Sequence, residues 1–413
     1  MNFILVSVGT DGDVFPYAGL GSVLRERGHR VTLVASGQYA PLAAAHGFEF
    51  RPLVSQEENR ELLEDPGFWN PLKTAQISAR WGNRFIGRQY DLLSELATPG
   101  DSVLVSNPGV LASSIVHEKS GRPLANLVLQ PWMIRSTDAP PVMPLFGLAR
   151  WPRPAVNFFW RLLDGVVDGL MGSHLNRVRV SVGLKPARRI FRNWLARQLV
   201  IGMFPEWYGP PQRDWLPQIR LVGFPRFDGV AAGATLPEEL ERFLAQGSPP
   251  VAFTFGTEML HARELFKKCS EACVRAGKRG IFLTRYRQQL PDVFPADQNH
   301  CAFAPFQQLF PRCAGVVHHG GIGTTARALA AGRPQVVVPI CFDQMDNAAR
   351  VQSLGVGETV GRGRPVAEFA QALVRLTTME RVQQARDLAA TRDFSTDAFG
   401  AAARLVEGLV GQA

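Results

Sequence analysis

The 413-residue sequence lacks the features that define several classes of protein. No apolar stretch is long enough to span a bilayer. The apolar run FILVSV near the start ends in GTDGD without a cleavage site, so it does not read as a signal peptide. The five cysteines form no CxxC pair, which is typical of buried thiols in a reducing compartment. We therefore expect a cytoplasmic protein without a disulfide framework.

Acidic residues are fewer than basic residues, and the formal net charge is +9 at pH 7. The excess is carried mostly by arginines that are scattered along the chain, from Arg25 to Arg364, and that form no single basic block. This distribution indicates a solvated surface and disfavours a nucleic-acid partner. It leaves an anionic ligand, or peripheral contact with the headgroups of a membrane, open.

Strands and helices alternate in two successive halves of the chain. Strands are expected at 3–8, 30–35 and 48–53, and the alternation restarts after 236. It predicts parallel sheets with right-handed crossovers. The alternation predicts the α/β class, with two similar doubly wound domains in tandem. The expected parts are an N-terminal domain over 1–204, an interdomain linker over 205–235, a C-terminal domain over 236–390, and a last helix over 391–413 that packs back on the N-terminal domain.

Two segments of the first half show no clear periodicity. Residues 56–98 read as irregular and aromatic, and the proline-rich stretch 131–154 reads as a long loop. The dinucleotide fingerprint GxGxxG is also absent after the first strand. A nicotinamide-dependent dehydrogenase is therefore disfavoured.

The turn GTDGDVFP, residues 9–16, follows the first expected strand. Gly12 permits a tight turn, and Asp13 lies outside the carboxyl end of the strand, where open α/β sheets bind ligands. Because Pro16 suits the first turn of a helix, Asp13 also fits a helix cap. Position alone does not separate a catalytic Asp13 from a capping one, and Asp11 is expected to be solvated.

The segment GVVHHGGIGTTARA, residues 315–328, joins a strand end to the start of a helix. Unpaired amides and the helix dipole at such a terminus attract anions, and glycine lets a ligand approach the backbone. We expect His318 to be a buried core residue. The absence of a Walker lysine excludes a P-loop. The expected pyrophosphate cradle consists of His319, Gly321, Gly323, Thr324 and Thr325.

A second polar turn, ICFDQMDNAARV, follows the strand QVVVP. Asp343 and Gln344 offer hydrogen-bond acceptors and donors together, which suits sugar hydroxyls. Asp346 and Asn347 fit the cap of the next helix equally well.

The segment HHGGIGTTARALAAGRPQVVVPICFDQMDNA resembles the donor-binding signature of the family 1, GT-B-fold glycosyltransferases, which use nucleotide-diphosphate sugars. GTDGDVFPYAGLGSVLRERGHRVTLV resembles the opening of bacterial members, and the resemblance covers essentially the whole chain. Within the family, GDVFP, RRIFRNW, FPEWYGPPQRDW and GFPRFDG look most like the rhamnosyltransferase branch of rhamnolipid biosynthesis, which uses dTDP-rhamnose and a hydroxyalkanoyloxy-alkanoate.

The resemblance implies a GT-B fold with two Rossmann-like doubly wound domains facing a cleft, in which the N-terminal domain binds the acceptor and the C-terminal domain binds the nucleotide sugar. It also implies a role for individual residues. Asp13 falls at the position of the general base, and Phe303 falls where a tryptophan usually stacks on the nucleobase. Gly256 and Thr257, in TFGT, match a phosphate-contacting loop. The remaining donor contacts that it implies are Gly12, His319, Gly321, Gly323, Thr324, Thr325, Asp343 and Gln344.

Two positions depart from plant members of the family. Arg327 stands where those enzymes carry a glutamate on the ribose, which is compatible with a deoxyribose donor. Asn107 lies near the position of the aspartate that orients a catalytic histidine, and an aspartate base does not need that partner.

We therefore expect an inverting hexosyltransferase that moves a sugar, L-rhamnose from dTDP-rhamnose, to the hydroxyl of a lipid-like acceptor. No metal and no cofactor are expected beyond the nucleotide-sugar co-substrate, because the helix terminus takes the place of a cation. Two alternatives stay open: a UDP-glucose-dependent glucosyltransferase acting on a small hydrophobic alcohol, and a catalytically silent protein that binds nucleotide sugar. Apolar acceptor contacts are expected from Trp69, Phe85, Trp132 and Phe146.

Overall fold

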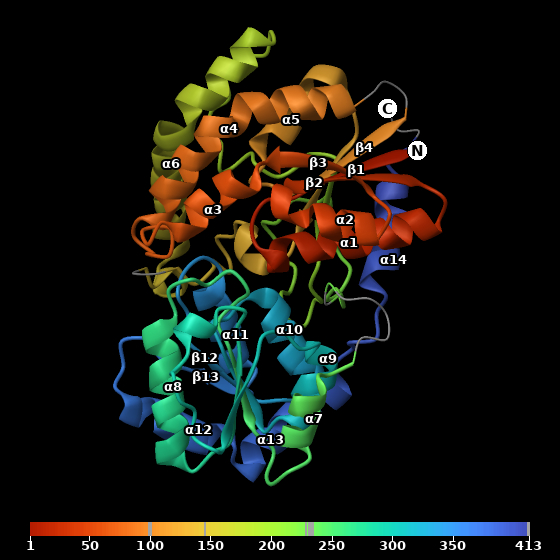
Figure 1. The fold of residues 1–413 in the computed structure, drawn as a ribbon. Helices are drawn as coiled ribbons and strands as arrows, with labels where there is room; N and C mark the ends of the chain where they lie inside the picture. The colour runs from red at the N-terminus through yellow and green to blue at the C-terminus, as the bar shows by residue number, and fades with distance from the viewer. Residues whose placement is uncertain (98–100, 144–145, 228, 230–234, 411–413) are drawn as a thin grey trace. The chain divides into compact units, whose positions relative to one another are not determined.

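The computed structural model describes residues 1–97, 101–143, 146–227, 229 and 235–410. The chain divides into two compact units (Figure 1). Unit 1 comprises Met1–Gly229 and Thr396–Ala413, and unit 2 comprises Val230–Ser395. Both units are built on parallel sheets, as the alternating sequence pattern predicts.

Unit 1 contains a seven-stranded sheet in the order β3-β2-β1-β4-β5-β6-β7. Every residue of β1, β4 and β5 is buried, as expected for parallel strands covered by helices on both faces. The strands are β1 (Asn2–Val6), β2 (Arg30–Ser36), β3 (Glu49–Val54), β4 (Ser102–Ser106), β5 (Leu124–Val128), β6 (Leu199–Gly202) and β7 (Ile219–Leu221). The α-helices of the unit are α1 (Asp11–Glu26), α2 (Ala40–Ala45), α3 (Gln56–Glu64), α4 (Thr74–Leu96), α5 (Leu111–Ser120), α6 (Arg153–Ser181) and α14 (Ala398–Glu407).

Unit 2 contains a six-stranded sheet in the order β10-β9-β8-β11-β12-β13. Its strands are β8 (Val251–Thr254), β9 (Gly280–Leu283), β10 (Gln298–Cys301), β11 (Gly315–His318), β12 (Gln335–Val337) and β13 (Gly357–Thr359). Its α-helices are α7 (Glu238–Leu244), α8 (Arg263–Ala276), α9 (Phe306–Leu309), α10 (Ile322–Ala330), α11 (Gln344–Ser353), α12 (Val366–Leu376) and α13 (Met379–Thr391).

The final helix, α14, packs on α1 within unit 1, although almost the whole chain separates the two in sequence (Figure 1). A Cβ on Gly19 of α1 would lie 2.3 Å from the ring of Phe399, so glycine lets the two helices approach closely. Arg27 forms a bidentate ion pair with Glu407, with both N–O distances 2.7 Å. The last helix therefore completes the N-terminal unit.

Two expectations about unit 1 were wrong. Residues 56–98 are not irregular, because α3 and α4 occupy most of them. A capping box between Ser55 and Glu58 starts α3, and this Ser-x-x-Glu pattern was readable in the sequence. The expected linker is also not a linker throughout, because β7 pairs with β6 and residues 205–229 belong to unit 1. Residues 228 and 230–234 of that stretch lie outside the described residues.

The proline-rich stretch that follows β5 is a loop with two short 3₁₀ turns, Pro131–Met133 and Leu148–Arg150. Residues 144–145 within it are not described. None of the helices in the described part of the chain combines the length and hydropathy that a bilayer-spanning segment needs.

Candidate functional site

In unit 2, the expected donor-binding residues follow the carboxyl ends of four strands of one sheet. β8 and β11 are neighbours, with His318 in register with Thr254. The turns after these two strands carry Gly256 and Gly320, whose φ angles are 101° and 96°. These positive angles are strained for other residues, so glycine shapes both turns. The expected donor segments thus meet at one edge of the sheet, where open α/β sheets bind ligands.

The imidazole of His319 lies between these two turns. A Cβ on Gly256 would lie 3.5 Å from its Nε2, and one on Gly321 would lie only 2.5 Å from the same atom. Burial lowers the pKa of His319 to about 4, and a hydrogen bond with the backbone of Thr254 opposes that effect. The Nδ1 atom is buried without a hydrogen-bond partner among the described residues. Such an atom fits a polar ligand group.

His318 has a different role. It is fully buried, its Nδ1 accepts a hydrogen bond from the amide of Gly320 at 3.1 Å, and its Nε2 lies 2.8 Å from Oε1 of Gln335. Because Nδ1 accepts, Nε2 carries the proton and donates to the glutamine oxygen. Burial, with a smaller contribution from His319, lowers the pKa of His318 to about 3. The expectation of a buried core histidine is confirmed, and the side chain also holds the glycine turn.

The two threonines in the first turn of α10 have different environments. Thr325 is fully buried and its hydroxyl donates to the carbonyl of Gly321 at 3.0 Å, so it braces the turn. Thr324 lies one position earlier and retains 9% of its exposure. A Cβ on Gly323 would meet no atom within 4 Å, so the space outside this residue is open. The amides at the start of α10 have no intrahelical acceptor and favour an anion there.

The turn after β12 is hydrogen-bonded to the turn at Gly320 that follows β11. Asn347 donates to the carbonyl of Gly320 at 2.8 Å and to Oδ2 of Asp343 at 2.6 Å. The Oε1 atom of Gln344 accepts from the amides of Ile340 and Cys341, at 2.7 and 3.0 Å. The two residues expected to contact the sugar therefore sit on a rigid support, with Asn347 as a positioning residue.

A strained residue precedes this pair. Phe342 has a φ of 56°, a left-handed conformation that is uncommon for a bulky side chain. Strain of this kind persists where surrounding contacts enforce it, and it concentrates at functional sites. No pattern in the sequence indicates this conformation.

Thr257 and Phe303 flank the same edge of the sheet. Thr257 follows β8 and Phe303 follows β10, and both side chains are partly exposed. A partly exposed aromatic ring offers a flat face for stacking. Gly12, the remaining expected donor contact, lies in α1 of unit 1. Within the described ranges, no cluster of three or more His, Cys, Asp or Glu side chains is placed to hold a metal ion.

In unit 1, Asp13 belongs to the first turn of α1. Its Oδ2 accepts from the amide of Thr10 at 2.9 Å and from the hydroxyl of Thr10 at 3.3 Å, which completes a capping box. Gly9 has a φ of 126°, and a Cβ there would lie 2.2 Å from that oxygen. Burial raises the pKa of Asp13 to about 6, against the effect of the Thr10 hydrogen bonds. The capping interpretation holds, and the raised pKa also suits a general base.

The structure contradicts the expectation for Asp11. It was expected to be solvated, but only 6% of it is exposed and its Oδ1 accepts from the Tyr39 hydroxyl at 3.1 Å. The fold of η1 (Gly37–Tyr39) brings this tyrosine to the turn. Asn107 is also buried, and its Oδ1 accepts from the amide of Gly109 at 2.8 Å.

The four expected acceptor residues occupy different environments. Trp69 and Phe85 are 8% and 3% exposed, and the indole of Trp69 donates to the carbonyl of Leu63. Both pack as core residues and leave little surface for a ligand. Trp132 is partly exposed, with an indole nitrogen that has no partner among the described residues. Phe146 is 41% exposed and packs against Phe159.

The loop that carries Trp132 is anchored to α6. The guanidinium of Arg135 pairs with Asp164 at 3.0 Å and lies over the ring of Trp160. The indole of Trp160 donates to the carbonyl of Ser136 at 3.1 Å, and the Ser136 hydroxyl donates to Asp214 at 2.8 Å. These contacts hold the start of the loop in one conformation.

Comparisons with known proteins agree with this architecture. Residues 3–137 match the glycosyltransferase family 28 N-terminal domain, and residues 279–392 match the erythromycin biosynthesis protein CIII-like C-terminal domain. The chain is 31% identical over 434 residues to "Glycosyltransferase GtfE" of Amycolatopsis orientalis, covering 100% of this chain and 98% of the relative. The chain therefore belongs to the family 1, GT-B-fold glycosyltransferases.

Two further comparisons bear on the ligands. The chain is 29% identical to "Sterol 3-beta-glucosyltransferase UGT80A2" of Arabidopsis thaliana, over 90% of this chain and 59% of the relative. The structure of the glycosyltransferase SsfS6 of Streptomyces sp. SF2575, complexed with thymidine diphosphate, superposes with a TM-score of 0.65. It shares 20% identity and covers 100% of both chains. The chain is a nucleotide-sugar-dependent glycosyltransferase, as the donor signature predicts.

Proposed function

We propose that this enzyme is an inverting transferase that moves L-rhamnose from dTDP-rhamnose to the hydroxyl of a lipid-like acceptor such as a hydroxyalkanoyloxy-alkanoate. The observation that carries the proposal is the His319 imidazole, whose Nε2 lies against Gly321 beside the open first turn of α10. An imidazole and backbone amides at one sheet edge suit a diphosphate leaving group.

The reaction follows from the chemistry of the two units. The acceptor oxygen attacks the anomeric carbon of the sugar while the bond from that carbon to the diphosphate oxygen breaks. Asp13 takes the hydroxyl proton, for which a pKa near 6 is well suited at neutral pH. His319, Thr257 and the amides near Thr324 take up the charge that develops on the leaving diphosphate. Attack from the face opposite the leaving group inverts the anomeric configuration.

Binding of the donor rests on the other residues of the same edge. Phe303 would stack on the thymine ring, and Asp343 and Gln344 would contact the sugar hydroxyls. The thymidine diphosphate named with SsfS6 supports a thymidine donor, as do the segments that resemble rhamnosyltransferases. The mechanism needs no metal ion, so we expect full activity in the presence of EDTA.

A second candidate is a UDP-glucose-dependent glucosyltransferase acting on a small hydrophobic alcohol. The similarity to a sterol 3-beta-glucosyltransferase favours it. A catalytically silent protein that binds nucleotide sugar is less well supported, because burial raises the pKa of Asp13 to about 6, which suits a general base. The partly exposed Trp132 and Phe146 suit either apolar acceptor.

The test is a matrix of donors and acceptors analysed by mass spectrometry. dTDP-rhamnose, UDP-glucose and dTDP-glucose are each combined with a hydroxyalkanoyloxy-alkanoate and with a small aromatic alcohol. Transfer of 6-deoxyhexose to the lipid supports the proposal, and transfer of glucose to the alcohol supports the second candidate. Binding of dTDP without transfer or hydrolysis of any donor indicates the silent protein.

A further inference from the structure

The outer face of α6 exposes a row of large apolar side chains. Phe158, Leu162 and Val166 are 62%, 55% and 57% exposed. Their four-residue spacing places them along one side of the helix. Proteins seldom expose contiguous apolar side chains without a partner, so this row indicates an interaction surface.

The charges around this row are positive. Arg80 of α4, and Arg161 and Arg177 of α6, are exposed and have no hydrogen-bond or ion-pair partner among the described residues. Both acidic side chains of α6 are engaged elsewhere. Asp164 pairs with Arg135, and Asp168 accepts from two backbone amides at 2.7 and 2.8 Å. The exposed arginines therefore give this face a positive charge.

The opposite flank of α4 does not cancel this charge. Arg84 pairs with Glu61 at 2.9 Å, and Arg88 pairs with Glu58 at 2.5 Å. These two glutamates of α3 are thus engaged by arginines other than Arg80.

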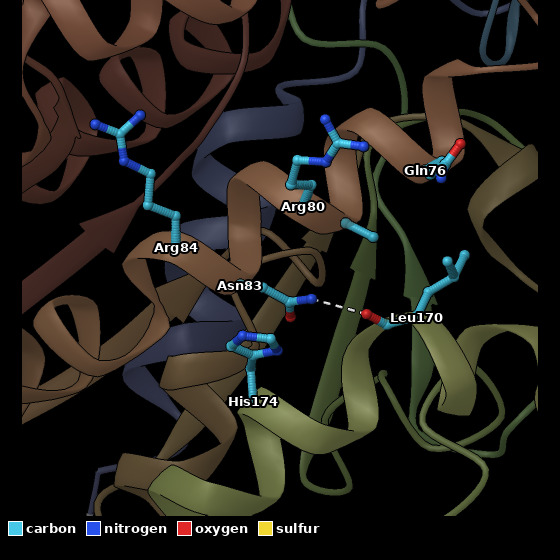
Figure 2. A pocket seen from close by; sticks show the side chains of 7 residues that line it. Gln76, Arg80, Asn83, Arg84, Leu170 and His174 are labelled. Carbon is cyan, nitrogen blue, oxygen red and sulfur yellow. Dashed lines mark hydrogen bonds between the residues drawn. The ribbon is translucent and has the colours of Figure 1, made fainter.

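A pocket of about 340 Å³ opens between α4 and α6 (Figure 2). The four-residue spacing on α6 continues into its lining through Leu170 and His174. Asn83 of α4 donates to the carbonyl of Leu170 at 2.7 Å, and its own Oδ1 is buried without a partner among the described residues. Arg80 also lines the pocket, and no acidic side chain does. The guanidinium of Arg80 and the imidazole of His174 can donate hydrogen bonds to an anionic group, to which the Asn83 Oδ1, an acceptor, does not contribute.

We propose that the outer face of α4 and α6 binds the surface of an anionic lipid bilayer. A lipid phosphate occupies the pocket beside Arg80 and His174, and the row Phe158–Leu162–Val166 enters the boundary between headgroups and acyl chains. Amphipathic helices with aromatic and aliphatic residues beside arginines bind membranes in this way. The rim of cations favours an anionic membrane over a second copy of the chain, which would bring like charges together.

The experiment is flotation of the full-length protein with vesicles of pure phosphatidylcholine or of phosphatidylcholine with phosphatidylglycerol. We expect binding to the anionic vesicles only, and loss of binding as salt rises. The double variant Phe158→Ser/Leu162→Ser should lower the partition coefficient more than tenfold. Arg80→Gln should lower it about fivefold, because one basic contact to the surface is lost.

The matched controls carry equivalent changes in unit 2. Val293→Ser/Met379→Ser removes side chains that are 82% and 90% exposed, and Arg263→Gln removes an exposed arginine. Both controls should bind vesicles like the unmodified protein. Equal loss in the controls, equal binding to neutral vesicles, or no binding at all would overturn the proposal. So would a dimer in gel filtration that the Phe158→Ser/Leu162→Ser change dissociates.

This inference goes beyond the proposed function and is tested separately. Vesicle flotation uses no substrate, so its result is independent of the donor and the acceptor. The thermal unfolding midpoint of the surface variants should equal that of the unmodified protein, which shows that they remain folded.

Discussion

The two units share a parallel, doubly wound sheet, but burial has opposite consequences for the key group of each. In unit 1 burial raises the pKa of Asp13 to about 6, and in unit 2 it lowers the pKa of His319 to about 4. In both cases the neutral form is favoured, because a low dielectric penalises charge. The pKa of the carboxyl group is thereby moved toward physiological pH, and the pKa of the imidazole is moved away from it. The same physical effect thus gives unit 1 a group that can exchange a proton and unit 2 a group that stays neutral.

Glycine supports both groups in the same manner. Gly9 and Gly256 follow the strands β1 and β8 and both have positive φ angles. Each leaves room for the side chain beside it, which is Asp13 in unit 1 and His319 in unit 2. We therefore expect loss of Asp13 to lower turnover, and changes around His319 to lower the affinity for the donor.

The largest expected effect comes from Asp13→Asn. Turnover should fall by about 10²–10⁴-fold because asparagine cannot accept the proton, while the dissociation constant for dTDP should stay nearly unchanged. Steady-state kinetics and calorimetry with dTDP measure the two quantities. Asp11→Asn is the matched control and should keep most of the turnover. Unchanged turnover in Asp13→Asn would show that another group is the base.

The variant Gly321→Ala addresses unit 2. The added Cβ would lie 2.5 Å from Nε2 of His319, so the ring must move. We expect kcat/KM for the nucleotide sugar to fall by about 10–10³-fold, together with the affinity for dTDP. Gly363→Ala is the control, since a Cβ there would meet no atom within 4 Å. Normal binding of dTDP by Gly321→Ala would argue against the proposed diphosphate site.

The pH profile separates the two groups. The base must be ionised, so kcat/KM should rise with pH and level off above the pKa of Asp13, about 6. Below that value the rate should fall about tenfold per pH unit. His319, with a pKa of about 4, should add no change above pH 5. An acid limb centred near pH 4 would contradict the assignment of Asp13.

The smallest expected effect comes from Gln335→Leu, which removes the hydrogen-bond partner of His318, the side chain that holds the turn at Gly320. It leaves the proton on Nε2 of His318 without an acceptor in a fully buried position. The free energy of unfolding should fall by about 1–3 kcal/mol, measured by chemical denaturation. Gln383→Leu, on an exposed position of α13, should change it by less than about 0.5 kcal/mol. Equal stability of the two variants would mean that the His318 contact is not structural.

Much of the molecule was readable from its sequence. The alternation of apolar runs and helical patterns predicted both parallel sheets, and glycines beside polar residues marked the edge of the unit 2 sheet that carries the donor signature. These signals are local, because a strand, a turn and a helix start are each specified by a few neighbouring residues. The capping box that begins at Ser55 is also a local signal, and it could have predicted the start of α3.

Other features depended on contacts between distant residues. Asp11 and Asp13 differ by two positions, and only the packing of Tyr39 shows that Asp11 is buried. His318 was correctly expected in the core, but only the structure shows that Gln335 on the neighbouring strand is its hydrogen-bond partner. Trp69 and Phe85 looked like ligand contacts, yet they are buried by α3 and α4.

The sequence by itself determined the order of the elements, the fold class and the segment that signals a nucleotide-sugar donor, because periodicity and turn residues act over short distances. Only the tertiary structure decided that Asp11 is buried, that α14 packs on α1, and how far burial shifts the pKa of Asp13. Those properties depend on what surrounds a side chain in space, and residues far apart in the chain provide that environment.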